Sequence, residues 1–162
     1  MPTVKAIRRA VGTNRRRAGA DTARLAGRDL LAIADLSAAE VRCLLDLAEQ
    51  IKRQPERFSR ALRGRSLALV FEKPSLRTRV TFELGMQQLG GETIYLGPQD
   101  IGLGKREAVG DVARNLERWF SAIMIRSFAH DTVRELAAGA SIPVINGLSD
   151  LYHPCQILAD LL

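Results

Sequence analysis

Residues 67–79 of the chain read LALVFEKPSLRTR. The five apolar residues at the start predict a buried β-strand, because a short continuous apolar run fits a strand that is covered on both faces. The residues from about 78 to 89 predict a helix, which Gly90 and Gly91 would end. A strand that leads through a short polar segment into a helix is typical of α/β folds, in which helices connect parallel strands.

The rest of the chain repeats this alternation. Ser37 and Glu40 form a capping-box pattern ahead of apolar residues that recur at helical spacing as far as Ile51. Further strands are predicted at 93–96, 123–125 and 143–145, and further helices through Trp119, at 131–138 and from about 154 onward. We therefore expect an α/β fold of three layers, in which a largely parallel central sheet of about four strands is flanked by helices. We expect the core to include Cys43, Leu44, Leu45 and Trp119.

The net charge of +6 comes from the beginning of the chain. Residues 1–28 hold eight of the 24 basic side chains and one of the 18 acidic ones, so the remaining residues have a net charge of −1. We interpret residues 1–27 as a basic, disordered extension and residues 28–162 as one folded domain. The alternatives for the extension are a nucleic-acid-binding arm and an organelle transit peptide, and disorder is favoured over both.

Hydropathy and cysteine content exclude several classes of protein. No stretch approaches the roughly 18 uninterrupted apolar residues of a membrane-spanning helix. Two cysteines, Cys43 and Cys155, are too few for a disulfide scaffold and do not have the paired spacing of metal ligands. A reducing, cytoplasmic setting is therefore expected.

Polar residues follow the predicted strands, where α/β proteins bind ligands. Residues 75–78, Ser-Leu-Arg-Thr, open a helix, so free backbone N–H groups would lie beside two hydroxyls and a guanidinium, an arrangement suited to a phosphate. A serine cap with surface arginines explains the same segment equally well. Two nucleotide motifs are excluded: Gly104-Lys105 lacks the Ser or Thr of a Walker loop, and Glu107 occupies the third glycine position of a dinucleotide fingerprint.

Three segments together resemble a known family. Residues 71–79, FEKPSLRTR, resemble the carbamoyl phosphate signature of the aspartate and ornithine carbamoyltransferases, and residues 102–128 are similar to the family's next loop, helix and strand. Residues 153–156, His-Pro-Cys-Gln, are similar to an element of the ornithine enzymes, whereas the aspartate enzymes usually have Thr at the position of Cys155. The resemblance covers residues 25–162 and favours the ornithine branch.

The resemblance implies a role for each matching residue. Ser75, Arg77, Thr78 and the backbone N–H of Leu76 would hold the phosphate of carbamoyl phosphate. The catalytic residues would be Arg126, bridging the phosphate and the carbonyl oxygen, His153, donating to that oxygen, and Gln156, accepting from the carbamoyl NH₂. Lys105 would reach a neighbouring subunit of a homotrimer, and no metal or cofactor is implied. Arg79 is predicted to form a structural ion pair, His130 to cap a helix, and Cys155 to be a packed side chain.

The family also has a second domain, which binds the amino-acid substrate, and these 162 residues do not include it. We expect the carbamoyl phosphate-binding half of an ornithine carbamoyltransferase, inactive by itself. The alternatives are a non-catalytic phosphate-binding or regulatory remnant and a carbamoyltransferase for another amine, such as N-acylated ornithine or putrescine. A nucleic-acid-binding protein that uses the basic tail ranks last.

Overall fold

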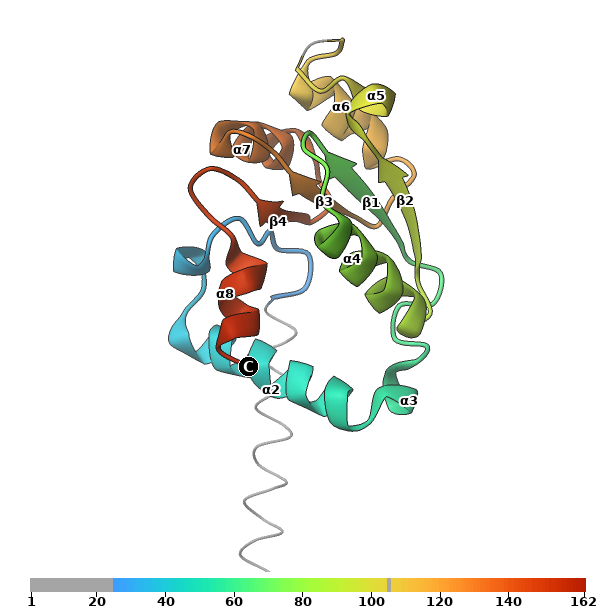
Figure 1. Cartoon of the computed structure of the whole chain (residues 1–162), viewed down its shortest axis with the longest axis vertical. Helices are drawn as coiled ribbons and strands as arrows, with labels where there is room; N and C mark the ends of the chain where they lie inside the picture. Colours follow the sequence, from blue (N-terminus) through green and yellow to red (C-terminus); the bar gives the residue numbers. More distant parts are fainter. Residues whose placement is uncertain (1–24, 105) are drawn as a thin grey trace, which may run out of the picture.

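The computed structural model describes residues 25–104 and 106–162 (Figure 1). At its centre is a four-stranded sheet in the order β2-β1-β3-β4, in which every neighbouring pair is parallel. The strands are β1 (Ser66–Phe71), β2 (Glu92–Leu96), β3 (Ala122–Arg126) and β4 (Val144–Leu148). The predicted α/β fold with a parallel sheet is confirmed.

Helices connect these strands. Within the described residues, η1 (Ile33–Asp35), α2 (Ala38–Arg53) and α3 (Pro55–Phe58) precede β1, and α4 (Leu76–Gln88), α5 (Pro98–Ile101), α6 (Val109–Leu116), α7 (His130–Gly139) and α8 (Pro154–Asp160) follow it. The predicted capping box begins α2: the Glu40 N–H donates to Ser37 Oγ at 3.3 Å, and the Ser37 N–H donates to Glu40 Oε2 at 2.7 Å. The short helices α3 and α5 have no apolar periodicity from which they could be predicted.

The two faces of the sheet pack against different helices. Alternate side chains of a strand point to opposite faces, so Val70 and Ile123 pack with α6 and α7, while Leu69 and Met124 pack with Phe82 and other residues of α4. Residues 67–71 of β1 are all buried, because β1 lies between β2 and β3 and is covered on both faces. This position explains why its sequence is continuously apolar.

Before α2 the chain runs along the outer edge of β4. The Leu30 N–H donates to the Val144 carbonyl at 2.9 Å, and the Asn146 N–H donates to the Leu30 carbonyl at 2.9 Å. Asp29 Oδ1 accepts the Val144 N–H at 2.7 Å. This segment pairs the free edge of β4, which protects the sheet from edge-to-edge association.

The structure corrects three predictions about packing and boundaries. Trp119 is 69% exposed, because α6 ends at Leu116 and the core position is taken by Phe120 instead. Leu44 and Leu45 are only half-buried, and in α2 only Cys43 is buried. Strand β4 continues to Leu148 instead of ending at residue 145, since its backbone pairs with β3 through a local irregularity.

Candidate functional site

The order of the strands places the candidate site at the carboxyl ends of β1 and β3. From β1 the chain moves outward to β2, then crosses to β3 on the other side of β1. In parallel sheets such a reversal leaves a crevice at the strand ends, and ligands bind there. Phe71 at the end of β1 pairs with Arg126 at the end of β3, and the Glu72 N–H donates to the Arg126 carbonyl at 2.9 Å.

The first turn of α4 lies at this crevice. Ser75 is the N-cap residue with an extended backbone, and its Oγ accepts the Thr78 N–H at 3.4 Å, so the predicted serine cap is present. The Ser75 hydroxyl also donates to Thr78 Oγ1 at 3.1 Å. The N–H groups of Leu76 and Arg77 begin the helix and so have no carbonyl partner one turn earlier. A helix of 13 residues adds its positive dipole end at the same place.

Arg126 connects β3 to the start of α4. Its Nη1 donates to Thr78 Oγ1 at 3.1 Å, which joins two of the predicted phosphate ligands to the predicted catalytic arginine. Its Nε is buried and has no hydrogen-bond partner in the described part of the chain. Burial, reinforced by the positive charge of Arg77, lowers the pKa of Arg126. The two guanidinium groups therefore repel each other electrostatically, and their combined positive charge suits a phosphate dianion.

His153 contributes a polar group at the end of the loop that follows β4. It is the N-cap of α8, and Pro154 follows at the first helical position. Burial, reinforced by the charge of Arg126 and opposed by Asp160, lowers the pKa of His153 below its ordinary value of 6.5. His153 Nδ1 is buried without a hydrogen-bond partner among the residues described. At neutral pH the imidazole is therefore uncharged, with one ring N–H that can donate to a ligand oxygen.

The titration of His153 tests this environment. We expect its imidazole to titrate with a midpoint below 6.5 in NMR spectra of the free protein. A group with a lowered folded-state pKa binds its proton more tightly in the unfolded chain, so its stability contribution is full above about pH 6.5 and declines as the pH falls below that value. In Arg126→Gln the midpoint should rise, because one positive neighbour is removed. A midpoint at or above 6.5 in the unmodified protein would contradict the buried, cation-facing position.

The predicted site residue Gln156 makes its hydrogen bond elsewhere. Gln156 is exposed on α8, and its Nε2 donates to Asp160 Oδ1 at 2.7 Å, so its amide is held along its own helix. Lys105 lies outside the described residues. The predicted cross-subunit role of Lys105 therefore stays a prediction.

Two structural predictions, an ion pair for Arg79 and a packed side chain for Cys155, are confirmed. Arg79 Nε forms an ion pair with Glu83 Oε1 at 2.9 Å, and its guanidinium lies 4.0 Å from the centroid of the Tyr95 ring. Cys155 donates its thiol to the Asn146 carbonyl at 3.7 Å, and burial raises the pKa of Cys155 to about 11. A thiol with such a pKa is a packed group and not a nucleophile at neutral pH.

The prediction that His130 caps a helix is wrong. Ala129 is the N-cap of α7, and His130 is the first helical residue, with a side chain that is 3% exposed. Its Nδ1 lies 3.1 Å from Ser149 Oγ, and its ring meets the Tyr152 ring edge to face, with centroids 4.8 Å apart. A single histidine near a helix start gives no sequence signal of such a distant partner.

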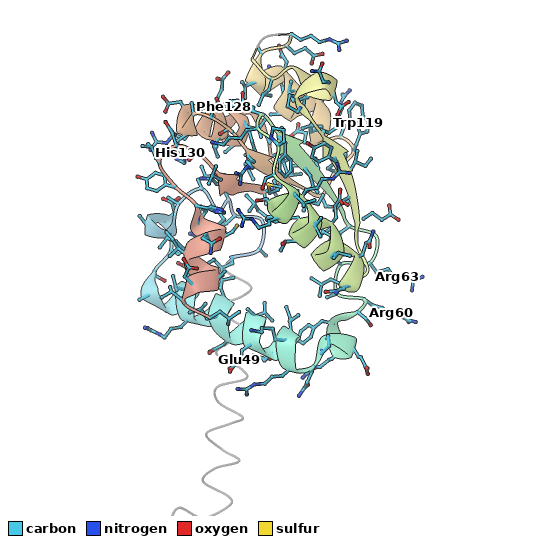
Figure 2. All side chains as sticks on the ribbon, in the orientation of Figure 1. Glu49, Arg60, Arg63, Trp119, Phe128 and His130 are labelled. Carbon is cyan, nitrogen blue, oxygen red and sulfur yellow. The ribbon has the colours of Figure 1, made fainter. Side chains whose placement is uncertain are left out.

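Sequence reasoning also missed an exposed aromatic ring at the site. Phe128, two residues beyond Arg126, is 62% exposed, and Figure 2 labels it at the carboxyl end of the sheet. Its N–H donates to Glu72 Oε2 at 2.9 Å, and Lys73 Nζ lies 5.2 Å from its ring centroid. These contacts join the segments that follow β1 and β3.

Two kinds of feature, a metal site and a membrane-spanning helix, are absent from the part of the chain that the structure describes. Across residues 25–104 and 106–162, no three of the His, Cys, Asp and Glu side chains lie together as a metal site would require. Over the same ranges, no helix has the length and apolar character needed to cross a lipid bilayer.

The fold and the site together define an α/β domain in which a helix begins, with free backbone N–H groups, at the switch point of its sheet. A family model described as "aspartate/ornithine carbamoyltransferase, carbamoyl-P binding domain" matches residues 28–162. The chain is 57% identical over 136 residues to an ornithine carbamoyltransferase of Deinococcus radiodurans, and the match covers 84% of this chain and 44% of that protein.

Comparison with solved structures also finds ornithine carbamoyltransferases. The ornithine carbamoyltransferase of Pyrococcus furiosus superposes with a TM-score of 0.82 and 48% identity, covering 85% of this chain and 44% of that one. The enzyme of Thermus thermophilus gives a TM-score of 0.76 and 53% identity, over 82% and 46%. The chain thus belongs to the family of carbamoyl phosphate-binding domains of the aspartate and ornithine carbamoyltransferases. It spans less than half the length of these relatives.

Proposed function

We propose that this chain binds carbamoyl phosphate as the carbamoyl phosphate-binding half of an ornithine carbamoyltransferase. The observation that carries the proposal is the hydrogen-bonded connection from Ser75 through Thr78 to Arg126 at the start of α4. Phosphate oxygens would replace or extend these contacts and accept from the N–H groups of Leu76 and Arg77. The carbamoyl group would then extend toward His153.

The proposed reaction transfers the carbamoyl group to the side-chain amine of ornithine, giving citrulline and phosphate. The amine nitrogen forms a bond to the carbonyl carbon, the bond from that carbon to the phosphate oxygen breaks, and the amine gives up a proton to the departing phosphate. Negative charge grows on the carbonyl oxygen and on the departing phosphate. Arg126 can stabilise both charges and His153 the first, and one such fixed donor typically contributes about 3 to 4 kcal/mol to catalysis.

Exposed apolar side chains beside the site support the proposal that another protein surface covers it during the reaction. Leu76, Phe128 and Leu151 are between 62% and 78% exposed, and each lies within two residues of a proposed ligand-binding group. A reaction of this kind benefits from exclusion of water and from a fixed position of the amine. We therefore expect the 162-residue polypeptide alone to bind carbamoyl phosphate without producing citrulline from added ornithine.

An NMR titration tests the ligand assignment. Carbamoyl phosphate should shift the backbone amide signals of Leu76, Arg77 and Thr78 together with the ring signals of His153. Inorganic phosphate should shift the same amides and affect His153 less, because it lacks the carbamoyl group. Equal responses to both ligands would favour the alternative of a non-catalytic phosphate-binding remnant. Amide shifts confined to other parts of the chain would contradict the proposal.

The acceptor amine and the cellular setting are further parts of the proposal. Ornithine is favoured over N-acylated ornithine or putrescine because the similar proteins from Deinococcus radiodurans and Anoxybacillus flavithermus are described as ornithine carbamoyltransferases. A cytoplasmic setting stays a prediction that rests on the sparse cysteines.

We also propose that the chain forms a homotrimer, and an exposed apolar row on α4 supports self-association. Leu76, Val80 and Leu84 are spaced four residues apart, so they share one helix face, and they are 78%, 39% and 50% exposed. Ile94 of the edge strand β2 is 56% exposed as well. Rows of exposed apolar side chains of this kind are typical of interaction surfaces.

Sedimentation equilibrium tests the proposed trimer. The unmodified chain should sediment at three times its monomer mass, and Leu84→Lys should shift the equilibrium to monomers because it places a charge in the apolar row. Ala138→Lys, at an exposed position of α7, is the matched control and should leave the mass unchanged. A monomeric unmodified chain at all concentrations would contradict this part of the proposal.

A further inference from the structure

A buried polar cluster lies between β4 and the predicted catalytic histidine. It consists of His130, Asn146 and Ser149, whose side chains are 3%, 0% and 6% exposed. Ser149 Oγ is its centre, because it lies 3.1 Å from His130 Nδ1 and 3.4 Å from Asn146 Nδ2. No residue of the cluster has a part in the reaction proposed above. Polar groups are buried at a cost, so a cluster of this kind calls for an explanation.

The cluster holds the segment 149–152 in a closed turn. The Tyr152 N–H donates to Ser149 Oγ at 3.2 Å, and the Tyr152 carbonyl accepts the Ser149 N–H at 2.9 Å. Asn146 Nδ2 donates to the same carbonyl at 3.3 Å and to the Leu31 carbonyl at 2.9 Å. The Tyr152 carbonyl is therefore attached to β4 through Asn146, and both its N–H and its carbonyl are bonded to Ser149, the residue that follows β4.

Helix α7 fixes the outer side of this turn. The His130 N–H donates to Asp150 Oδ1 at 2.8 Å, while the His130 ring packs edge to face on the Tyr152 ring. In Figure 2 the labelled His130 lies at the end of α7 that faces the loop between β4 and α8. Residues 149–152 are thus held from β4 on one side and from α7 on the other.

His153 is the next residue, and little conformational freedom separates it from this turn. Proline at position 154 restricts the backbone of the residue before it, and His153 has φ −137° and ψ 71°. Pro154 itself is buried, which fixes the start of α8. The backbone position from which the imidazole projects is therefore set by the turn that precedes it.

We propose that Ser149, through its contacts with His130, Asn146 and the Tyr152 backbone, is the positioning residue that fixes the backbone of His153 and so gives its imidazole the orientation that carbamoyl phosphate requires. Ser149 acts through the backbone and touches no reacting atom. This inference rests on the proposed function of the site, since it concerns the orientation of His153 toward that ligand.

Ser149→Ala tests the proposal, because it removes the hydroxyl and adds no volume. The matched control is Ser66→Ala, which removes one hydroxyl bond, from Ser66 Oγ to the Trp119 carbonyl at 3.1 Å, at the amino end of β1. The readout is the ring NMR signal of His153 in the ligand-free protein. The sequence has two histidines, and in the second variant His130→Phe the only histidine that remains is His153.

We expect Ser149→Ala to move the ring signals of His153 and to raise its titration midpoint toward 6.5, because the ring moves away from Arg126 and toward solvent. Affinity for carbamoyl phosphate should fall by about tenfold, which corresponds to the loss of one well-placed hydrogen bond from His153. Affinity for inorganic phosphate should stay within twofold. His130→Phe keeps an aromatic ring against Tyr152 and should produce the same changes to a smaller extent.

The proposal is overturned if the His153 signals and the carbamoyl phosphate affinity of Ser149→Ala match those of Ser66→Ala. If Ser149→Ala does not fold, the same two measurements are made on His130→Phe, and values that match those of Ser66→Ala overturn the proposal. Failure of the unmodified chain to bind carbamoyl phosphate would count against the proposed function instead. The two failures are distinguishable because the His153 signals are measured without ligand.

Discussion

Arg126→Gln should weaken carbamoyl phosphate binding by at least about 100-fold. Glutamine retains some hydrogen-bonding capacity but removes the positive charge and the forked geometry that matches phosphate oxygens. Arg126 Nη1 contacts Thr78 Oγ1 at the proposed phosphate site, and its buried Nε has no partner among the described residues. Removal of one partner from a buried, hydrogen-bonded pair of charges typically costs about 2 to 5 kcal/mol of binding free energy. Titration calorimetry measures the change.

Arg79→Gln is the control for this prediction. Arg79 lies in the same sequence motif, but its guanidinium is engaged by Glu83 and stacks on Tyr95. Its replacement removes an exposed ion pair, which is typically worth less than about 1 kcal/mol. Carbamoyl phosphate affinity should stay within about twofold. Comparable losses in Arg79→Gln and Arg126→Gln would mean that general positive charge, and not the position of Arg126, accounts for binding.

Gly147→Ala should lower the free energy of unfolding by about 1 to 3 kcal/mol, the usual range for overpacking a core. Gly147 occupies an irregularity in β4: Ile125 pairs with Asn146 and Arg126 pairs with Leu148, so Gly147 is the extra residue. A Cβ at this position would lie 2.4 Å from Met124 Sδ and 3.3 Å from the Ile125 carbonyl oxygen. Met124 is fully buried, so its side chain can yield only by displacing other core residues.

The matched comparison is Gly85→Ala, for which the opposite sign is expected. Gly85 lies inside α4, and a Cβ there would meet no atom within 4 Å. Alanine in a helix interior is more favourable than glycine by about 0.5 to 1 kcal/mol. Urea unfolding of the two variants measures both effects. Equal stabilities of Gly147→Ala and the unmodified chain would show that β4 is more adaptable than the structure indicates.

The bulge at Gly147 has a consequence for the site as well as for stability. Bulges bend a strand and redirect the side chains next to it, and this one lies directly beside Arg126. Gly147 also lies two residues before Ser149, the residue that we propose to position His153. Gly147→Ala should therefore reduce carbamoyl phosphate affinity together with stability.

The sheet could be predicted well from the sequence for a physical reason. Strands β1 and β3 are buried on both faces, and that environment imposes continuous apolar runs such as residues 67–71. The carboxyl ends of parallel strands meet at one edge of a sheet, so the runs alone predict that Arg126 lies near Ser75 and Thr78. Local patterns suffice here because the site is built at the ends of elements that the patterns define.

Other features depend on contacts that local patterns do not encode. The pairing of Leu30 with β4 joins segments more than 100 residues apart and leaves no periodic signal. Trp119 is apolar but follows the last turn of α6, so its exposure depends on where that helix ends. The contact of His130 with Ser149 joins α7 to a loop, and a helix-start histidine suggests only a local role.

The central claim is that the start of α4 and Arg126 form a phosphate site for carbamoyl phosphate. Calorimetric titration of the unmodified chain with carbamoyl phosphate, beside Arg77→Ala, tests it most directly. We predict saturable binding to one site per chain, and loss of that binding in Arg77→Ala, because Arg77 shares the positive charge next to Arg126. Absence of binding to the folded unmodified chain, or equal binding by Arg77→Ala, would contradict the claim.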